Sequence, residues 1–460
     1  MARLTLQEAS NKMGGRILTG TPSSVCEGYG IDTRQIQRGQ LFFSVIAERD
    51  GHNYIVQAAE KGALGAVISK KTQAPNKDFA LIEVNDTLKA LQDLSKNVRA
   101  DSGAEVIGIT GSIGKTTVKS FAAHLLSHRY SILESRGNFN NHLGLPLTLL
   151  RLEPEHEVAI LEMAMNSPGE IGLLTRISNP NVAVITNVNP VHLEFFQNID
   201  GIALAKKEIL DNMDPSRTAV LNGDDPHVRK IASDWKGDKI WFGLSEKCDI
   251  RAGSIRKESE DGITCHLKYG KTEGDVHLPF LYHSYLYNFL AASAIAHTQG
   301  IPVEDIIKRS GDLVPLPDRG RLYTLKNGIR LIDDSYNSNP AALESALDSL
   351  SEIRAERRVA VLGDMLELGQ KEQEFHREAG RQAHITGWDL LITVGPMGED
   401  IKEGAMEAGM DRSQIYSFQT SEEAARLTPT ILQSGDLVLV KGSRGVHTEK
   451  IVASIKERGN

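Results

Sequence analysis

Cysteine, tryptophan and long apolar runs are all scarce in this chain of 460 residues. The three cysteines, Cys26, Cys248 and Cys265, are odd in number and far apart, so they form neither a disulfide framework nor the paired spacing of a zinc site. Such cysteine usage is typical of a reducing cytoplasm. The first residues lack the apolar core of a secretion signal, and no apolar run is long enough to span a membrane. We therefore expect a cytoplasmic protein with no membrane partner.

An excess of positive charge is also missing, because the formal net charge at pH 7 is -8. Proteins that bind nucleic acid through a basic surface carry the opposite balance, so we expect no nucleic-acid partner. Hydrophobic residues make up 40% of the chain and charged residues 24%, which is ordinary for globular domains. At roughly 150 residues per domain, the length predicts about three domains.

A glycine-rich turn is the first feature of the sequence that indicates a binding site. The sequence V-I-G-I-T-G-S-I-G-K-T-T at 106–117 begins with residues that suit a buried strand, and Gly111 and Gly114 then allow a turn into a helix that begins near Lys115. Backbone N–H groups at the helix start and the Lys115 ammonium could hold phosphates, while the Thr116 hydroxyl could bind Mg²⁺. This stretch predicts a nucleotide-binding phosphate cradle.

The spacing of the cradle differs from the standard phosphate loop. The motif G-x-x-x-x-G-K-[ST] requires glycine where this chain has Ile109, and only the shorter form T-G-x-x-G-K-T-T remains. Ser112 and Thr117 belong to the same stretch and are further candidates for nucleotide contact. An ordinary glycine-rich turn between a strand and a helix stays an alternative at this point.

Periodicity and turn signals divide the chain into three units. Residues 1–101 contain an apolar run at 41–46, a polar turn at 48–52, a helix that ends at Gly62 and a strand-like run at 63–69, which together predict a small α/β domain. In residues 102–313, helices alternate with strands at 158–162, 182–187 and 219–222, which is typical of a parallel sheet. Two polar strands around Glu260, Asp261 and Gly262 predict a hairpin appended to that sheet.

The second boundary lies in L-V-P-L-P-D-R-G-R at 313–321, because two prolines and a glycine exclude a regular helix or a central strand. Strands follow at 330–333, 359–362, 390–394 and 437–440, with helices between them. The fold class is therefore α/β with three domains: a small N-terminal domain (1–101), a central parallel-sheet domain of the P-loop ATPase type (102–313) and a Rossmann-like doubly wound C-terminal domain (314–460).

Polar residues close several strands of the central unit. Glu162 follows V-A-I-L, Asn187 follows V-A-V-I-T, and His192 lies five residues beyond Asn187. Ligands of parallel sheets bind outside the carboxyl ends of the strands, so these side chains could join Thr116 around the terminal phosphate and a Mg²⁺ ion. A helix-cap or structural role is the alternative for each of them alone, and their convergence favours a site.

The cradle and these strand ends occur with further motifs that resemble the Mur ligase family of peptidoglycan precursor synthesis. The motifs of the central unit are L-E-M-A-M-N-S-P-G-E-I at 161–171, H-L-E-F-F at 192–196 and A-K-K-E-I at 205–209. Within the family, the sequence is most similar to the branch that adds D-alanyl-D-alanine to UDP-MurNAc-tripeptide. The motifs that carry this likeness are D-D-S-Y-N-S-N-P at 333–340, L-G-D-M-L-E-L-G at 362–369 and K-G-S-R at 441–444.

The resemblance implies an ATP-dependent amide ligase that makes UDP-MurNAc-pentapeptide. The tripeptide carboxylate would attack the γ-phosphate of ATP to give an acyl phosphate and ADP, and the amine of D-Ala-D-Ala would then displace phosphate. Thr116 and Glu162 would hold one Mg²⁺, and His192 would hold or position a second. Lys206 matches the lysine that family members carry as a carbamate, which is an anionic metal ligand, and a solvated helix lysine is the alternative. Lys207 is the natural control.

The resemblance also assigns contacts to both nucleotide substrates. Arg321 matches the arginine that reaches the γ-phosphate across the domain boundary, with Arg319 as the competing candidate. The contacts expected for the adenosine part of ATP are Asn288, Asp334, Tyr336 and Asn337. The contacts expected for the UDP-linked substrate are Asp32, Thr33, Arg34, Asp50, Gly51, His52 and Asn187. The groups that hold D-Ala-D-Ala stay open, with 337–339 and the loop at Asp364 as candidates, as does the third residue of the tripeptide.

Two stretches depart from the family pattern. The stretch L-Y-H-S-Y-L-Y-N at 281–288 contains aromatic residues where the family usually has H-N, and Asn189 and Pro190 replace small residues before His192.

The alternative functions are a sibling ligase that adds the third amino acid, a folate-polyglutamate ligase, and a regulatory protein that uses ATP only to change shape. We expect a monomer whose third unit opens and closes on the second.

Overall fold

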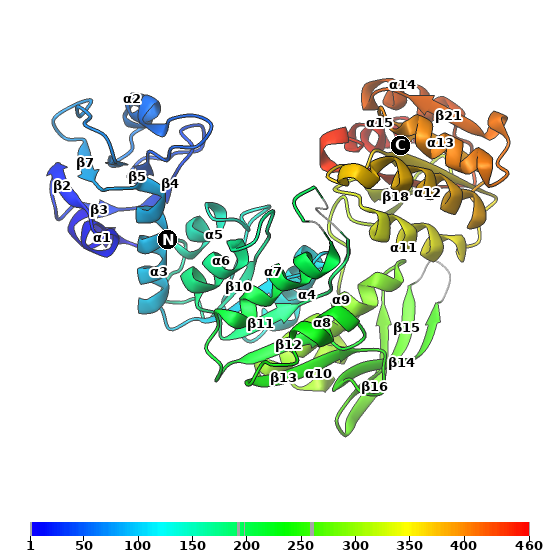
Figure 1. Ribbon diagram of the computed structural model, residues 1–460, viewed down its shortest axis with the longest axis horizontal. Coiled ribbons are helices and arrows are strands. Elements are labelled where there is room, and N and C mark those ends of the chain that lie inside the picture. The colour runs from blue at the N-terminus through cyan, green and yellow to red at the C-terminus, as the bar shows by residue number, and fades with distance from the viewer. Residues whose placement is uncertain (1, 191–193, 197, 258–261, 460) are drawn as a thin grey trace.

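The computed structural model describes residues 2–190, 194–196, 198–257 and 262–459. Three large sheets follow one another along the described chain, each flanked by helices, and the prediction of a three-unit α/β protein is confirmed. The first unit (blue) and the third (yellow to red) lie at opposite ends of the central unit (Figure 1). None of the helices within the described ranges is long and apolar enough to cross a membrane.

The first unit is built on a five-stranded sheet in which all neighbours are parallel except β2 and β7. In sheet order its strands are β2 (Arg16–Thr19), β7 (Ala80–Glu83), β6 (Gly65–Ile68), β5 (Gln40–Phe43) and β4 (Gly28–Gly30). A separate antiparallel pair consists of β1 (Leu4–Thr5) and β3 (Val25–Cys26). The helices are α1 (Leu6–Met13), a 3-10 turn at Gly51–Tyr54, α2 (Ile55–Glu60) and α3 (Thr87–Asp101).

Helix α3 connects the first unit to the second. The side chain of Asp86 caps its start by accepting hydrogen bonds from two backbone N–H groups. Its apolar face packs on the central helices α5 (Gly144–Leu149) and α6 (Glu170–Ser178). Near its end, the buried Arg99 donates to the carbonyls of Ser178 and Asn179. The two units therefore share one continuous apolar core at this helix.

The central sheet has nine strands and contains both parallel and antiparallel parts. In sheet order they are β16 (Thr272–Leu278), β15 (Ile263–Tyr269), β14 (Ile250–Lys257), β13 (Asp238–Gly243), β12 (Thr218–Asn222), β11 (Val182–Ile185), β8 (Glu105–Thr110), β10 (Val158–Glu162) and β9 (Ile132–Glu134). The strands β14 to β16 pair antiparallel, which confirms the predicted hairpin and adds one strand to it, while its turn at 260–261 lies outside the described residues. The remaining helices are α4 (Lys115–Leu126), α7 (Ile199–Asp211), α8 (Pro226–Ile231), α9 (His283–Thr298) and α10 (Val303–Ser310).

Strand β8 occupies the middle of the parallel part of this sheet. It is hydrogen-bonded to β11 on one side and to β10 on the other, and its residues from Val106 onward are buried. The order in the sheet, β12, β11, β8, β10 and β9, reverses direction at β8, so a crevice opens at its carboxyl end. The sequence V-I-G-I-T thus leads directly into the predicted cradle.

The third unit contains a six-stranded sheet. In sheet order its strands are β17 (Arg321–Thr324), β18 (Arg330–Asp334), β22 (Asp436–Lys441), β19 (Arg357–Gly363), β20 (Leu390–Val394) and β21 (Ile415–Phe418). All are parallel except β17, an edge strand that directly follows the proline-containing linker. The helices are α11 (Pro340–Ser351), α12 (Glu372–Ile385), α13 (Gly398–Glu407), α14 (Ser421–Ile431) and α15 (Glu449–Gly459), with 3-10 turns at Gly369–Lys371, Arg412–Gln414 and Arg444–Val446.

Candidate active site

The predicted phosphate cradle forms the turn between β8 and α4. Gly111 and Gly114 both have positive φ, 149° and 88°. A Cβ atom on Gly111 would lie 1.9 Å from the hydroxyl of Thr186, and one on Gly114 would lie 2.2 Å from the side-chain oxygen of Asn288. Only glycine fits these positions, because a side chain would be strained in the backbone and would also collide with its neighbour.

Lys115 bends back over the cradle. Its Nζ donates to the carbonyl of Gly111 at 2.8 Å and to that of Ser112 at 3.2 Å. Burial lowers the pKa of this ammonium, the charge of Arg319 acts in the same direction, and Glu162 opposes them. A polyphosphate in the turn would supply the anion that this desolvated cation lacks.

Two asparagines that follow β11 form hydrogen bonds with the cradle. Asn187 accepts from the backbone N–H of Ile113 at 2.9 Å, and its amide donates to the carbonyl of Ile113 at 3.0 Å. Asn189 continues this brace, because its N–H donates to the hydroxyl of Ser112 at 2.8 Å. Asn187 therefore lies beside the cavity, as predicted for a site residue, but its side chain is already occupied in shaping the cradle.

Thr116, in the first turn of α4, lies beside Glu162 at the carboxyl end of β10. The Thr116 hydroxyl donates to Glu162 Oε2 at 2.9 Å, and Asn140 donates to Oε1 of the same carboxylate at 2.9 Å. Glu162 is only 3% exposed. A buried carboxylate with a neighbouring hydroxyl and amide provides hard oxygen donors of the kind that Mg²⁺ binds.

Arg319, rather than Arg321, reaches this group. Its Nη2 donates to the hydroxyl of Thr116 at 3.2 Å, and its guanidinium lies 3.9 Å from the ring centroid of Tyr336. The hydroxyl of Tyr285 also donates to the carbonyl of Arg319. Arg321 begins β17, is exposed and lies over Tyr323 instead. Of the two candidates in R-G-R, the structure brings Arg319 to the cradle.

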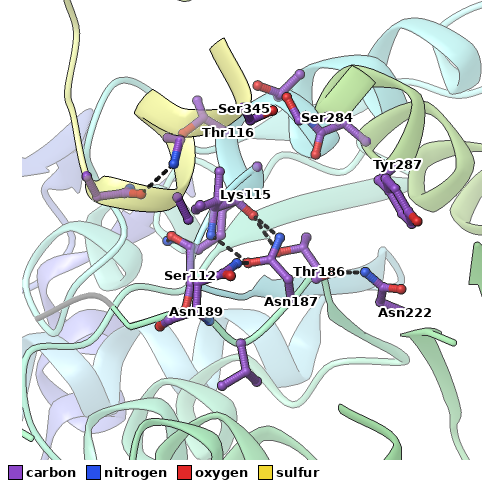
Figure 2. A pocket seen from close by; sticks show the side chains of 18 of the residues that line it. Ser112, Lys115, Thr116, Thr186, Asn187, Asn189, Asn222, Ser284, Tyr287 and Ser345 are labelled. Carbon is purple, nitrogen blue, oxygen red and sulfur yellow. Dashed lines mark hydrogen bonds between the residues drawn. The ribbon is translucent and has the colours of Figure 1, made fainter. Parts of the chain in front are cut away.

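A cavity of about 760 Å³ extends from the cradle between the second and third units. Figure 2 looks into it, with Lys115 and Thr116 between Asn187, which follows β11, and Ser345 of α11. All four residues predicted for the adenosine part of ATP line it, namely Asn288, Asp334, Tyr336 and Asn337. Ser112 and Thr117 line it as well. The cavity volume is within the range expected for a nucleotide-sized ligand.

An ion pair organises the part of the cavity that belongs to the third unit. Lys441, at the end of β22, donates to Asp334 at 2.8 Å and to the carbonyl of Asn337 at 3.1 Å. Both charged side chains are almost completely buried. The pair joins the ends of β18 and β22 and fixes the loop that carries Tyr336 and Asn337.

Lys206 is a buried lysine on α7. It is 2% exposed, and in the described part of the chain its ammonium forms no hydrogen bond or ion pair. Burial lowers the pKa of Lys206 well below its usual value, and the charge of Lys115 lowers it further. Lys207 is paired with Asp211 and Asp234, which raise its pKa. His192, the other residue predicted for the second metal, lies outside the described residues.

The candidates of the first unit gather at one edge of its sheet. Asp32 follows β4 and forms an ion pair with the exposed Arg34, while Thr33 donates to Gln57. Asp50 and Gly51 follow β5, and a Cβ atom on Gly51 would lie 2.7 Å from the backbone at Ser44 and Val45. These strands are parallel, so their carboxyl ends meet at the same edge.

His52 is held in one tautomer in this group. Its Nε2 accepts from the backbone N–H of Ser69 at 3.0 Å, so Nδ1 carries the proton and donates to Asp50 at 2.7 Å. Lys70 also donates to Asp50 at 2.6 Å. The hydrogen bonds from Lys70 and His52 hold the pKa of Asp50 well below its usual value. None of these first-unit residues is among those that line the cavity between the second and third units.

Several residues of the site were not found from the sequence. Asn140 belongs to the asparagine-rich run G-N-F-N-N-H at 137–142, whose composition marks a polar loop but gives no partner. Tyr287 donates to Asp224 at 3.1 Å, and both line the cavity. Tyr282 packs against Gly320, so part of the aromatic cluster at 281–288 holds the linker of the third unit. No group of three or more His, Cys, Asp or Glu side chains suited to a metal occurs among the described residues.

Comparisons with known proteins agree with this geometry. The Mur ligase middle domain profile matches residues 109–296, and the profile of the Mur ligase glutamate ligase domain matches 319–444. UDP-N-acetylmuramoyl-tripeptide:D-alanyl-D-alanine ligase of Bacillus subtilis is 34% identical over 436 residues, which cover 94% of this chain and 94% of that protein.

Two crystal structures extend the match to the whole fold. MurF from Acinetobacter baumannii superimposes with a TM-score of 0.91 at 29% identity and covers 99% of both chains. MurF ligase from Thermotoga maritima in complex with ADP gives 0.83 at 28% identity and covers 94% of this chain and 98% of its own. The cradle, the boundary arginine and the full-length similarity lead to the same conclusion: this chain belongs to the Mur ligase family.

Proposed function

We propose that this protein is the Mur ligase of the MurF type, which joins D-alanyl-D-alanine to UDP-MurNAc-tripeptide with hydrolysis of ATP to ADP and phosphate. The relatives that match over nearly their full length carry this activity in their names. The observation that supports it most directly is the contact of Thr116 with both Glu162 and Arg319 beside Lys115. Phosphoryl transfer needs such a set of cations and hard oxygen ligands at one point.

The chemistry begins with two anions that repel each other. The terminal carboxylate of the tripeptide attacks the γ-phosphate of ATP, and an acyl phosphate forms while ADP leaves. Lys115 and Arg319 offset the negative charge that builds up, and we assign to Arg319 the role that the resemblance gave to Arg321. The free amine of D-Ala-D-Ala then attacks the acyl carbon, phosphate leaves, and the amine loses one proton.

Thr116 and Glu162 fit a first Mg²⁺ ion. They present a hydroxyl and a buried carboxylate 2.9 Å apart, and Asn140 orients the carboxylate from behind. Bound there, Mg²⁺ would neutralise the charge of the β- and γ-phosphates and orient them for in-line attack. For a second ion we propose Lys206 and His192, of which only Lys206 belongs to the described residues.

The environment of Lys206 favours a carbamate. A buried ammonium close to Lys115 is unfavourable, and burial keeps the amine in the neutral form that reacts with CO₂. The reaction forms a C–N bond, releases one proton and converts a cationic side chain into an anionic oxygen ligand. This would remove the repulsion between two lysines and create a metal ligand in one step.

We propose three domains, 1–101, 102–313 and 314–460, each of which binds a different substrate. The first would hold the UDP part of the acceptor through the edge that carries Asp32 and Asp50. The second would bind ATP through the cradle, and the third would add Asp334 and Tyr336 to the ATP site and bind the dipeptide.

All the proposed sites belong to one chain, so a monomer suffices. The unpaired buried thiols of Cys26, Cys248 and Cys265 suit the cytoplasm.

The deciding experiment is phosphate release from ATP by the purified protein. UDP-MurNAc-tripeptide and MgCl₂ are supplied with D-Ala-D-Ala or with a single free amino acid, and the product is identified by mass. Release that requires D-Ala-D-Ala and yields the pentapeptide, and that stops when the metal is chelated, is expected. Turnover with UDP-MurNAc-dipeptide and a diamino acid would instead identify the sibling ligase, turnover with a folate and glutamate the folate-polyglutamate ligase, and ATP binding without turnover the regulatory alternative.

A further inference from the structure

Arg444 lies beyond the carboxyl end of β22, and among the described residues this cation has no anionic partner. It follows β22, is exposed, and in the described part of the chain forms no hydrogen bond or ion pair through its guanidinium. Its neighbours differ, because Lys441 pairs with Asp334 and Lys456 with Asp333. Burial raises the pKa of Asp318 and the charge of Arg444 acts in the opposite direction, but within the described ranges the two side chains form no ion pair.

A ring contact joins Arg444 to the reacting end of the ATP site. Its guanidinium lies 5.6 Å from the ring centroid of Tyr336, and that of Arg319 lies 3.9 Å from the same centroid. The separation of the two guanidinium groups therefore cannot exceed the sum of these distances. Because Arg319 also contacts Thr116, this bound places Arg444 in the neighbourhood of the point where we expect the acyl phosphate.

The loop at 337–339, to which Ser443 is hydrogen-bonded, offers further polar groups. The hydroxyl of Ser443, which precedes Arg444, donates to the carbonyl of Ser338 at 3.2 Å and accepts from the N–H of Leu366 at 3.0 Å. Ser338 is 4% exposed, and its own hydroxyl has no hydrogen-bond partner. On either side of Ser338, Asn337 and Asn339 line the cavity. The hydrogen bond of Ser443 thus holds the backbone at Arg444 beside this loop, in which the hydroxyl of Ser338 still lacks a partner.

The chemistry of the acceptor fits this spacing. D-Ala-D-Ala has an amine at the end that reacts and a carboxylate at the other, and an extended dipeptide spans about 7 Å. An amine at the acyl phosphate beside Arg319 would leave the carboxylate near Arg444. Arginine binds carboxylates through two parallel hydrogen bonds, which fix the direction of a bound peptide as well as its affinity.

We propose that Arg444 binds the terminal carboxylate of the acceptor dipeptide and so sets the specificity for an acceptor with a free carboxylate. This inference rests on the proposed function, of which it names one substrate contact. Tyr336 then contacts both the guanidinium that acts on the phosphate and the guanidinium that holds the acceptor.

The test compares D-Ala-D-Ala with its neutral amide, D-alanyl-D-alaninamide, in the wild type and in Arg444→Gln. The wild type should prefer the free carboxylate by about 10- to 100-fold in kcat/KM, the range expected for a hydrogen bond to a charged group. Arg444→Gln should lose this preference, with the KM for ATP unchanged. Arg444→Lys should retain part of it, and Arg426→Gln on the exposed face of α14 is the matched control.

Each other outcome has a distinct meaning. A wild type that accepts acid and amide equally well overturns the carboxylate contact while leaving the proposed function intact. Equal losses for both acceptors in Arg444→Gln, with a raised KM for ATP, would assign Arg444 to the nucleotide or the fold. Absence of any D-Ala-D-Ala-dependent phosphate release by the wild type would overturn the proposed function, and this inference with it.

Discussion

The guanidinium of Arg319 donates a hydrogen bond of 3.2 Å to the hydroxyl of Thr116, across the boundary between the second and third units. Arg319 belongs to the linker that precedes β17, and Thr116 to the first turn of α4. The cation to which we assign the reacting phosphate therefore belongs to the linker itself. A movement of the third unit would change this contact directly, which couples domain closure to the assembly of the ATP site.

Replacement of Arg319 by alanine should lower kcat by about 100- to 1000-fold, because a positioned cation at the transferring phosphoryl group would be lost. Arg321 is the matched control, since it lies two residues further along and is exposed. Arg321→Ala should keep kcat within about threefold of the wild type. Steady-state phosphate release at saturating substrates measures both variants. A larger loss in Arg321→Ala than in Arg319→Ala would restore the assignment that the family resemblance implies.

Lys206→Ala should abolish ligation, and a small carboxylate such as acetate or formate should restore part of it. The reason is that a free carboxylate can occupy the space of the lost side chain and supply the oxygen ligand that we assign to the carbamate. The measurement is turnover as a function of added carboxylate. A ¹³C signal of a carbamate in wild-type protein supplied with labelled bicarbonate would give an independent readout.

Lys207→Ala is the control for this experiment, because the ammonium of Lys207 is already paired with Asp211 and Asp234. It should retain near wild-type activity and show no response to acetate. Carboxylate rescue in Lys207→Ala, or full activity in Lys206→Ala, would contradict the metal-site assignment.

The fold was largely predictable because its signals are local. Glycine positions, apolar runs and proline-rich boundaries lie next to the elements that they determine, as in the turn from β8 into α4. The convergence of Glu162 with Thr116 was also predictable, since parallel strands end at one edge of a sheet. Short or exposed strands such as β13 and β21 were not predicted, because their apolar pattern is weak.

The contacts across the boundary were less predictable. R-G-R offered two arginines of equal chemistry, and only the path of the linker, with Gly320 packed on Tyr282, distinguishes Arg319 from Arg321. Asn140 escaped prediction for a similar reason, because its partner Glu162 is distant in sequence. Such pairings depend on tertiary geometry rather than on residue type.

Gly111→Ala should raise the KM for ATP by at least about tenfold and destabilise the central unit. The new Cβ would lie 1.9 Å from the hydroxyl of Thr186, a branched side chain directly after β11, and 3.1 Å from its backbone nitrogen. Relief of this overlap must shift the cradle, and a strained φ adds about 1 to 3 kcal/mol. Gly103→Ala is the control, since its new Cβ would have no atom within 4 Å. Equal ATP affinity in both variants would show that the cradle tolerates the change.

Asp364 gives a prediction for the dependence of stability on pH. Its side chain follows β19, is 4% exposed and has one carboxylate oxygen without a partner. Burial raises the pKa of Asp364, while a hydrogen bond from the backbone of Met397 acts in the opposite direction. With a folded-state pKa above the unfolded value of about 3.9, the stabilising contribution is fully present below that value and is lost as pH rises through the folded pKa.

Asp364→Asn should therefore unfold at a higher temperature than the wild type near neutral pH, by about 2 °C or more, because the amide avoids an ionised carboxylate in a buried site. The difference should shrink as the pH is lowered, because more of the wild-type carboxyl is then protonated. Asp411→Asn is the control with the opposite sign, because hydrogen bonds from Ser413 lower the pKa of Asp411 and its charge is stabilising at neutral pH. Thermal unfolding followed by circular dichroism at several pH values measures both. A stability gain in Asp364→Asn that is independent of pH would mean that packing, and not the charge of this carboxylate, limits the stability of the third unit.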